Sequence, residues 1–138
     1  MLSIHPATPS HRLSIRQCFL RVFDSSEVSN FDRIEELSYS YVGIDRHNDV
    51  RAFIIVTPSH QYAEFEIAYL GVDRRYRGKG YAKLLIKLIL RNLEKNSIWL
   101  NTLEENKEAR SLYENVGFIE IDKFKDVNNV NSIIYKYR

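Results

Sequence analysis

Residues 75–80 of this 138-residue chain, RYRGKG, combine two glycines with several cations and directly precede an apolar, helix-forming segment. The first N–H groups of a helix have no internal partner, and the helix dipole adds partial positive charge there. Gly78 and Gly80 leave room for a ligand to approach the backbone, because neither has a Cβ atom. The cations around the two glycines are Arg75, Arg77 and Lys79. Together these features predict a site for a phosphate-bearing ligand.

Two common phosphate motifs do not fit this stretch. A Walker loop needs Ser or Thr after Gly-Lys, where this chain has Gly80, and a dinucleotide fingerprint needs a third glycine where Lys83 stands. Two alternatives stay open: a solvated basic turn, and an RNA-binding surface that interleaves aromatic residues with cations. The net charge of the chain is only +2, which argues against a general nucleic-acid coat. The charge is local, with five cations against one anion, or +4, from 73 to 83.

A second group of residues that could do chemistry is a pair of carboxylates in the segment YAEFEIAYLGV, 62–72. Glu64 and Glu66 are two residues apart, so on a strand both side chains leave the same face. Burial and mutual repulsion would raise the pKa of at least one of them, which makes both candidate general bases. The alternative is a solvated strand face, with an ion pair to Arg51 across a hairpin.

The elements that must position these residues follow from the hydrophobic periodicity. Seven strands are predicted at 2–5, 41–45, 50–57, 62–72, 98–103, 118–123 and 132–137. Four helices are predicted at 10–23, 31–39, 78–95 and 106–116. Two hairpins then surround a strand–helix–strand unit. We therefore expect one α/β (α+β) domain over 1–138, with a central mixed β-sheet flanked by helices on both faces.

The remaining composition bounds the class of protein. Cys18 is the only cysteine, and the four histidines lack the spacing of a helical metal pair, so we expect neither a disulfide nor a metal site. The N-terminus has no apolar signal core, and the most apolar run is interrupted by Lys83 and Lys87. We expect a soluble, cytoplasmic protein without a membrane span. Apolar residues make up 44% of the chain, enough for one packed core.

Two segments of the chain resemble one known family. The order Arg75 to Gly80 resembles the signature Arg/Gln-x-x-Gly-x-Gly/Ala of the GNAT superfamily of N-acetyltransferases, and it lies between a strand and a long helix as that family requires. The segment NKEARSLYENVGF, 106–118, resembles the second segment of the family, with its Asn, Ala, Leu-Tyr-Glu and Gly-Phe. The resemblance implies a GNAT-like acyltransferase fold over nearly the whole chain.

The resemblance also implies acetyl-CoA as the phosphate-bearing ligand. By analogy, backbone amides from Arg77 through Tyr81 hold the pyrophosphate. The backbone of Leu70, Gly71 and Val72 pairs with the pantetheine arm, which lies like an added strand in a gap of the sheet, with the Val72 N–H directed at the thioester carbonyl. Asn106 is expected to contact coenzyme A, although a simple helix N-cap is an equal alternative.

For catalysis, the resemblance implies direct acetyl transfer to an amine. Tyr113 matches the general acid for the departing thiolate, with core packing as the alternative. A phenol has a pKa near 10 and a thiol near 8.5, so we expect a hydrogen bond more than full proton donation. In some members a catalytic Glu stands where Glu64 does. In others an acidic residue closes the next strand, but here that position is Asn101, which shifts the expected base to Glu64 or Glu66.

The acceptor is not specified by any motif. The family places its acceptor beside the N-terminal helices, and residues 24–36 carry five acids against one Arg, a local charge of −4. An acidic helix surface is the plain interpretation. If the acids face the cleft, they favour a cationic small amine or the amine of a basic peptide. A non-catalytic acyl-CoA-binding role is an alternative function. We expect no nucleic-acid partner, and a homodimer is one option for the assembly.

Overall fold

The computed structural model describes residues 1–138 and contains one seven-stranded sheet with the order β1-β2-β3-β4-β5-β7-β6. The strands are β1 (Ser3–Pro6), β2 (Tyr41–Ile44), β3 (Val50–Pro58), β4 (Phe65–Val72), β5 (Ile98–Leu103), β6 (Ile119–Lys125) and β7 (Asn131–Tyr137). Only β4 and β5 are parallel, and every other neighbouring pair is antiparallel. The predicted mixed sheet is therefore confirmed.

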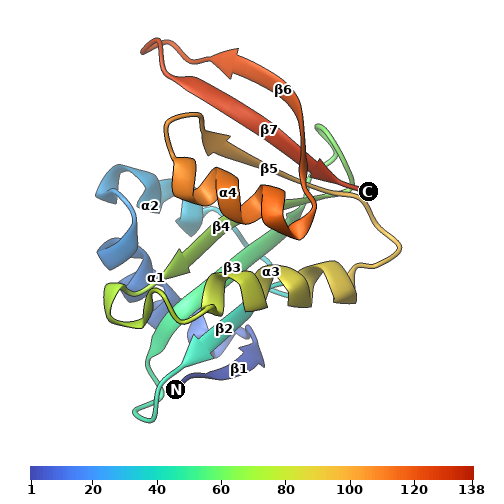
Figure 1. The fold of residues 1–138 in the computed structure, drawn as a ribbon. Coiled ribbons are helices and arrows are strands. Elements are labelled where there is room, and N and C mark those ends of the chain that lie inside the picture. Colours follow the sequence, from blue (N-terminus) through green and yellow to red (C-terminus); the bar gives the residue numbers. More distant parts are fainter.

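Helices cover both faces of this sheet, as predicted. They are α1 (Arg12–Val22), α2 (Val28–Asp32), α3 (Tyr81–Asn92) and α4 (Lys107–Val116), with short 3-10 turns η1 (Pro9–His11), η2 (Ser25–Glu27) and η3 (Arg74–Tyr76). Figure 1 shows α3 and α4 in front of the sheet and α1 and α2 behind it. None of the helices is long and apolar enough to cross a bilayer.

Side chains that alternate along the strands divide between two apolar cores. The face under α3 and α4, the α3 face, buries the larger core. Its fully buried members include Ile54, Leu85, Ile86, Ile89, Ile98, Leu100 and Tyr135. The opposite α1 face buries a second core, which includes Ile15, Cys18, Phe19, Phe31, Phe53 and Ile55. Two cores on two faces hold the central strands rigidly, which is what a site at the strand ends requires.

A gap opens in the middle of the sheet. β4 and β5 pair only at their first residues, Phe65 with Ile98 and Glu66 with Trp99. Beyond these two positions the strands diverge, as Figure 1 shows. The rest of β4 therefore presents unpaired backbone groups toward β5. We call this opening between β4 and β5, beyond Glu66 and Trp99, the gap.

A bulge in β4 decides which of its side chains share a face. Ile55 pairs with Tyr69 and Val56 with Ile67, so Ala68 is an extra residue. Alternation is interrupted there, and Glu66 and Tyr69 both leave on the α1 face. Without the bulge, residues three apart on a strand would leave on opposite faces.

The sheet ends in an open edge at β6, where every residue is exposed. The register with β7 shifts between Glu120 and Asp122, so Ile121 is a bulged residue. Apolar and charged side chains alternate along this edge, with Ile119, Ile121 and Phe124 exposed.

The predicted helix at 31–39 is wrong. Helical structure lies earlier, in η2 and α2, and residues 33–40 form no helix. Asp24 starts this earlier helical segment by accepting a hydrogen bond from the Ser26 N–H at 2.9 Å. The sequence Asp24-Ser-Ser-Glu27 is a helix-start signal that the periodicity argument missed. Leu37 is buried in the α1-face core, which holds the following loop against the sheet.

Two predicted boundaries also change. The strand predicted at 62–72 begins only at Phe65, because residues 59–64 form turns. The helix predicted at 78–95 begins at Tyr81, because Gly78 and Gly80 both adopt positive φ angles, 74° and 85°. The left-handed conformation of Gly80 ends the loop directly before the first helical residue.

Candidate active site

The glycine loop, residues 77–83, carries a run of free backbone donors. The N–H groups from 78 through 83 make no hydrogen bond within the protein, and the first one used by α3 is that of Leu84, which donates to the Gly80 carbonyl at 3.0 Å. A Cβ built on Gly78 or Gly80 would meet no atom within 4 Å. Open space therefore lies over consecutive N–H donors at a helix N-terminus, a suitable place for a phosphate group.

The predicted set of amides, Arg77 through Tyr81, needs one correction. The Arg77 N–H closes the preceding turn on the Arg74 carbonyl at 3.4 Å, so the free donors begin one residue later. They also extend past Tyr81 through Ala82 and Lys83. The signature pattern in fact fits a second time, as Arg77-x-x-Gly80-x-Ala82, and this register matches the observed helix start.

The three predicted cations, Arg75, Arg77 and Lys79, adopt different positions in and before the loop. Arg77 Nε donates to the Val72 carbonyl at 3.0 Å, so its side chain lies against the end of β4. Lys79 Nζ lies 5.7 Å from the ring centroid of Tyr76. Tyr81 is tied to the N-terminus, because its hydroxyl accepts a hydrogen bond from the Leu2 N–H at 2.8 Å. Arg75 is anchored through its backbone, whose N–H donates to Asp73.

The backbone of Leu70 and Val72 faces the gap. The Asp73 N–H donates to the Arg51 carbonyl of β3 at 2.7 Å, and antiparallel strands alternate between bonded and unbonded residues. Val72 and Leu70 therefore turn their N–H and C=O groups away from β3. Gly71 does not: its backbone faces β3, and a Cβ on it would lie 2.7 Å from the Phe53 ring. Gly71 is required for packing.

Helix α4 is fixed at both ends by its own sequence. Asn106 is the N-cap, and its Oδ1 accepts the Ala109 N–H at 3.1 Å. Gly117 ends the helix in a left-handed conformation with φ of 110°, and the Phe118 N–H returns to the Tyr113 carbonyl at 3.0 Å. The predicted helix at 106–116 is confirmed to within one residue, and the Asn106 side chain serves the cap.

Tyr113 lies on α4 toward the α3-face core. Its ring packs 5.9 Å from Phe118 and 6.2 Å from Tyr135 between centroids, and its hydroxyl has no hydrogen-bond partner in the protein. Burial raises the pKa of Tyr113 to about 12. The hydroxyl is therefore protonated throughout the neutral range and keeps a donor free. The ring of Tyr113 therefore packs in the core, and its hydroxyl is still free to donate a hydrogen bond.

Glu64 is placed in a turn, apart from the strand. Its carboxylate accepts hydrogen bonds from Asn96 Nδ2 at 3.0 Å and from the Ser97 N–H at 3.2 Å. These bonds, led by that of Asn96, lower the pKa of Glu64. The residue thus ties the turn before β4 to the turn before β5, where the gap is closed. The predicted shared strand face of Glu64 and Glu66 is wrong, because β4 begins after Glu64.

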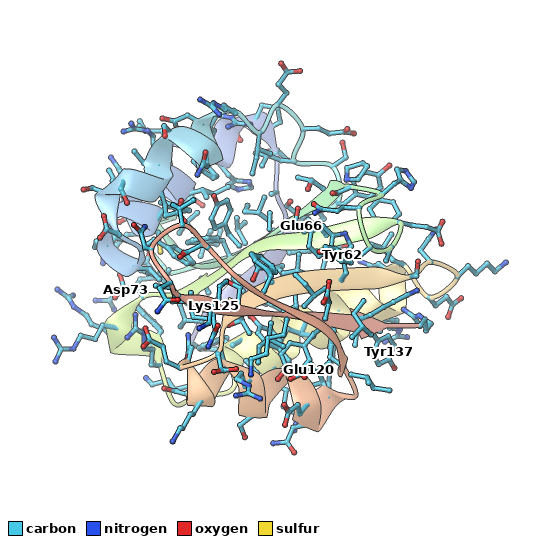
Figure 2. All side chains as sticks on the ribbon, turned by 90° about the horizontal axis from the view of Figure 1, so that it is seen from above. Tyr62, Glu66, Asp73, Glu120, Lys125 and Tyr137 are labelled. Atoms are coloured by element: carbon cyan, nitrogen blue, oxygen red, sulfur yellow. The ribbon has the colours of Figure 1, made fainter.

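Glu66 is half-buried on the α1 face, opposite Trp99 on one side and Thr57 on the other. Burial raises the pKa of Glu66. Burial also raises the pKa of Tyr69, and the nearby carboxylates of Glu27 and Glu66 add to that effect. In Figure 2, Glu66 lies on the side of the sheet that faces the blue N-terminal helices.

The alternative ion pair between Arg51 and these two carboxylates does not form. Arg51 bonds to Asp45 at 2.8 Å and to Asp73 at 3.2 Å, and not to Glu64 or Glu66. Glu66 is left without an ion-pair partner. Across the gap, Asn101 lies on β5 two residues beyond Trp99, the residue that pairs with Glu66, and it is exposed on the same α1 face.

The acidic N-terminal region borders a cavity near Glu66. The cavity has a volume of about 390 Å³ and is lined by Arg33, Ile34, Glu35, Glu36, Thr57 and Pro58. Thr57 is the β3 residue that pairs with Glu66, so the cavity adjoins the α1-face end of the gap. No group of three or more His, Cys, Asp or Glu side chains is arranged to hold a metal ion.

Comparison with known proteins identifies the family. A family model described as "Acetyltransferase (GNAT) family" matches residues 10–118, which is most of the chain. The chain therefore belongs to the GNAT acetyltransferase family and is an acyltransferase, as the two sequence segments predicted. Acetyl-CoA is the co-substrate of this family, so the predicted co-substrate is confirmed at the level of the family.

Individual relatives differ in what they acetylate. The "5-NmdU N-acetyltransferase" of Pseudomonas phage PaMx11 is 24% identical over 122 residues, covering 86% of this chain and 87% of the relative. The spermidine N(1)-acetyltransferase of Vibrio cholerae is 26% identical over 129 residues, covering 80% and 71%. The solved NatC complex bound to Gag peptide and CoA has a TM-score of 0.81 at 20% identity, covering 98% and 96% of the two chains, a likeness of fold.

Proposed function

We propose that this protein transfers the acetyl group of acetyl-CoA directly to a primary amine, and that the gap between β4 and β5 is the place of transfer. The observation that carries the proposal is the arrangement around the gap. Free N–H donors of the glycine loop lead to it, and Glu66 lies at it on the α1 face. Acetyl-CoA fits this arrangement as a phosphate-bearing ligand with an extended arm.

Backbone groups of this chain would bind the diphosphate and the pantetheine arm of acetyl-CoA. The diphosphate would lie over the N–H groups of 78–83, where no Cβ obstructs it. The pantetheine arm would pair with the outward N–H and C=O groups of Leu70 and with the Val72 N–H, while the Val72 carbonyl already accepts a hydrogen bond from Arg77 Nε. The outward N–H groups of Val72 and Leu70 are then the donors for the thioester carbonyl, where negative charge develops during transfer, and that of Leu70 is the closer of the two to Glu66 along β4.

The reaction forms one bond and breaks another, and an acceptor bound as an ammonium loses two protons. After the first proton has left, the amine nitrogen attacks the thioester carbonyl carbon, a C–N bond forms, the C–S bond breaks, coenzyme A leaves as a thiolate, and the nitrogen loses its second proton to become the amide. An alkyl amine with a pKa of about 10.4 is neutral in only about one molecule in a thousand at pH 7. A base that removes a proton from the bound ammonium, directly or through water, therefore accelerates the reaction.

Glu66 is the better of the two candidate bases. Glu64 is engaged by Asn96 and Ser97, and its pKa is lowered, chiefly by the Asn96 hydrogen bond, which makes it a weak base. Glu66 has no ion-pair partner, and its burial raises its pKa toward the range a base needs. Its side of the sheet is the one that the acceptor can reach from the α1–α2 region.

Tyr113 would act from the other face of the sheet. A thiolate that leaves toward α4 meets the only unengaged hydroxyl of that helix face, and Tyr113 can donate a hydrogen bond to it. With a pKa of about 12 for Tyr113 and about 8.5 for a thiol, full proton transfer is uphill by roughly 5 kcal/mol. Tyr113 therefore stabilises the thiolate by hydrogen bonding, and the proton is taken up from solvent.

For the acceptor, we favour a cationic amine. Glu27 lies close enough to Tyr69 to influence its pKa, and Glu35 and Glu36 line the cavity beside Thr57. Carboxylates on the path to Glu66 would concentrate ammonium groups and repel carboxylate-bearing molecules. The spermidine acetyltransferase among the relatives makes a polyamine the first candidate, with the amine of a basic peptide as the second.

The test is an acetyl-transfer assay over a panel of amines. The panel contains spermidine, a diamine, a basic peptide with a free N-terminus and an acidic amino acid, with thiol release and the mass of the acetylated product as readouts. We expect transfer to at least one cationic amine. Tight coenzyme A binding without transfer to any amine would indicate the non-catalytic role. Thermal stabilisation by RNA but not by coenzyme A would indicate the nucleic-acid alternative.

A further inference from the structure

Asp73 lies between β4 and the glycine loop, and it is the only buried charged residue in the chain, with 5% of its surface exposed. Figure 2 labels it on the ribbon. It is neither a predicted site residue nor part of the transfer chemistry described above. A buried carboxylate at the entrance to an anion site would repel phosphate unless its charge is compensated.

Both carboxylate oxygens of Asp73 are engaged by different elements. Oδ1 accepts the Arg75 N–H at 3.2 Å and caps the η3 turn that leads into the loop. Oδ2 accepts Arg21 Nε of α1 at 2.9 Å and Arg51 Nη1 of β3 at 3.2 Å. The backbone participates too, because the Asp73 carbonyl accepts the Tyr76 N–H at 2.8 Å. One residue thus ties the start of the loop to two elements of the α1 face.

The arginines around Asp73 are fully offset by carboxylates. Burial alone would raise the pKa of Asp73, but the hydrogen bonds from the Arg75 amide, Arg21 and Arg51 lower it below the ordinary value. Arg51 also binds Asp45 at 2.8 Å and lies 3.8 Å from Asp49. Three carboxylates and two guanidinium groups therefore add no net positive charge beside the loop. Its contribution to phosphate binding must come from geometry.

We infer that Asp73 is a positioning residue for coenzyme A: it fixes the turn that aims the glycine-loop N–H groups at the diphosphate. The inference rests on the proposal that this loop holds the diphosphate. Position and charge predict opposite effects for removal of the carboxylate. A neutral residue at 73 leaves the site more positive, which by charge alone tightens the binding of an anion. Loss of the anchor loosens the donors and weakens that binding.

The experiment measures Kd for coenzyme A by calorimetry and Kd for pantetheine by NMR titration. Pantetheine has the same arm but lacks the diphosphate. Asp73→Asn is compared with Asp32→Asn, a matched control at an exposed ion pair in which Arg16 Nε lies 3.0 Å from Asp32. We expect Asp73→Asn to weaken coenzyme A binding by about fivefold to tenfold, the size of one lost hydrogen bond, because a single amide oxygen cannot accept both the Arg75 N–H and the two guanidinium groups; pantetheine binding should be unchanged. Asp32→Asn should change neither.

A second pair of variants covers the case in which Asp73→Asn does not fold. Asp73→Ser keeps an oxygen that can cap the Arg75 N–H, so it should recover part of the affinity that Asp73→Ala loses. Unchanged or tighter coenzyme A binding in the Asp73 variants overturns the inference. Equal weakening of coenzyme A and pantetheine overturns it too, since that is a general loosening. If Gly80→Val leaves coenzyme A binding intact, the loop assignment itself has failed.

Discussion

The two sides of the gap are built from different materials. On the cofactor side, the groups available to a ligand are backbone N–H and C=O groups, from Leu70 and Val72 and from the glycine loop. On the acceptor side they are side chains, namely Glu66, Tyr69 and the acids of the N-terminal region. The first side is framed by α3, which follows the glycine loop, and by the capped helix α4; the second is framed by α1, the five-residue α2 and the loop after it.

This difference explains why the cofactor side can be recognised in the sequence as a motif and the acceptor side cannot. Backbone groups are positioned by glycines, caps and helix starts, which leave fixed residue types at fixed spacings. Side-chain recognition needs only a suitable group at a suitable place, which many sequences provide. The donor of the acetyl group is therefore predictable at the level of the family, and the acceptor must be measured.

The largest effect is expected where the two sides meet, at Tyr113. Tyr113→Phe removes the free hydroxyl and keeps the ring that packs against Phe118 and Tyr135. We expect kcat to fall by roughly 10-fold to 1000-fold with little change in the Kd of coenzyme A, as for a group that acts in the transition state. Steady-state kinetics and calorimetry check this. Turnover near that of the wild type would leave Tyr113 as a core residue only.

On the acceptor side, Glu66→Gln should lower kcat/KM by roughly 10-fold to 100-fold at neutral pH. Because burial raises the pKa of Glu66, the wild-type rate should fall as pH drops through a value above the ordinary one of about 4.3. The ratio of variant to wild-type rate, taken across pH, cancels the titration of the acceptor. Glu64→Gln is the matched control, and its rate should still fall at low pH as that of the wild type does. If both variants keep the wild-type rate and the same fall in rate at low pH, water alone is the base.

On the cofactor side, Gly80→Val should raise the Kd of coenzyme A at least tenfold, because the new side chain occupies the space over the free N–H groups. Gly80 also has a φ of 85°, so part of any effect comes from backbone strain. Gly117→Ala, at a φ of 110° at the C-terminal end of α4, provides a control for backbone strain outside the loop, although its methyl group also lies 3.0 Å from the Tyr137 ring. Equal losses in both variants would contradict the steric explanation.

The success of sequence reasoning followed the same division. The fold class, α4 with its Asn106 cap and Gly117 stop, and the glycine loop before α3 were all predictable, because each depends on neighbours in the chain. The turn at Glu64 and the bulge at Ala68 were not, because the first is set by Asn96 and Ser97 in the turn before β5 and the second by pairing with β3. Asp73 was missed for the same reason: its arginine partners are 52 and 22 residues away.

A smaller effect is expected from salt. The acidic residues near the acceptor path should give a diamine a higher kcat/KM than a neutral monoamine of similar length, and this preference should shrink by a few fold between low and high ionic strength. Exposed charges are screened over about 8–10 Å at 0.1–0.15 M salt. The double variant Glu35→Gln/Glu36→Gln should lose the salt dependence. No preference for the diamine at either salt would refute electrostatic selection.

The smallest effect concerns stability. A raised pKa in the folded state means that the ionised form of Glu66 is disfavoured by folding. Its stabilising effect is complete when the carboxyl is protonated, below the unfolded pKa, and is lost as pH rises through the folded pKa. Glu66→Gln should therefore melt about 1–3 °C higher than the wild type at pH 8 and equally at pH 4. A lower melting temperature at pH 8 would contradict the burial argument.

The alternating charges along the β6 edge bear on how molecules meet each other. When two copies of a strand pair around a two-fold axis, residues equally distant from the axis stand opposite one another. An axis through Asp122, Lys123 or Lys125 sets that charge against itself, and an axis through Phe124 sets Lys123 against Lys125. Each of these pairings is repulsive. Symmetric pairing of two copies along this open edge is therefore disfavoured by charge.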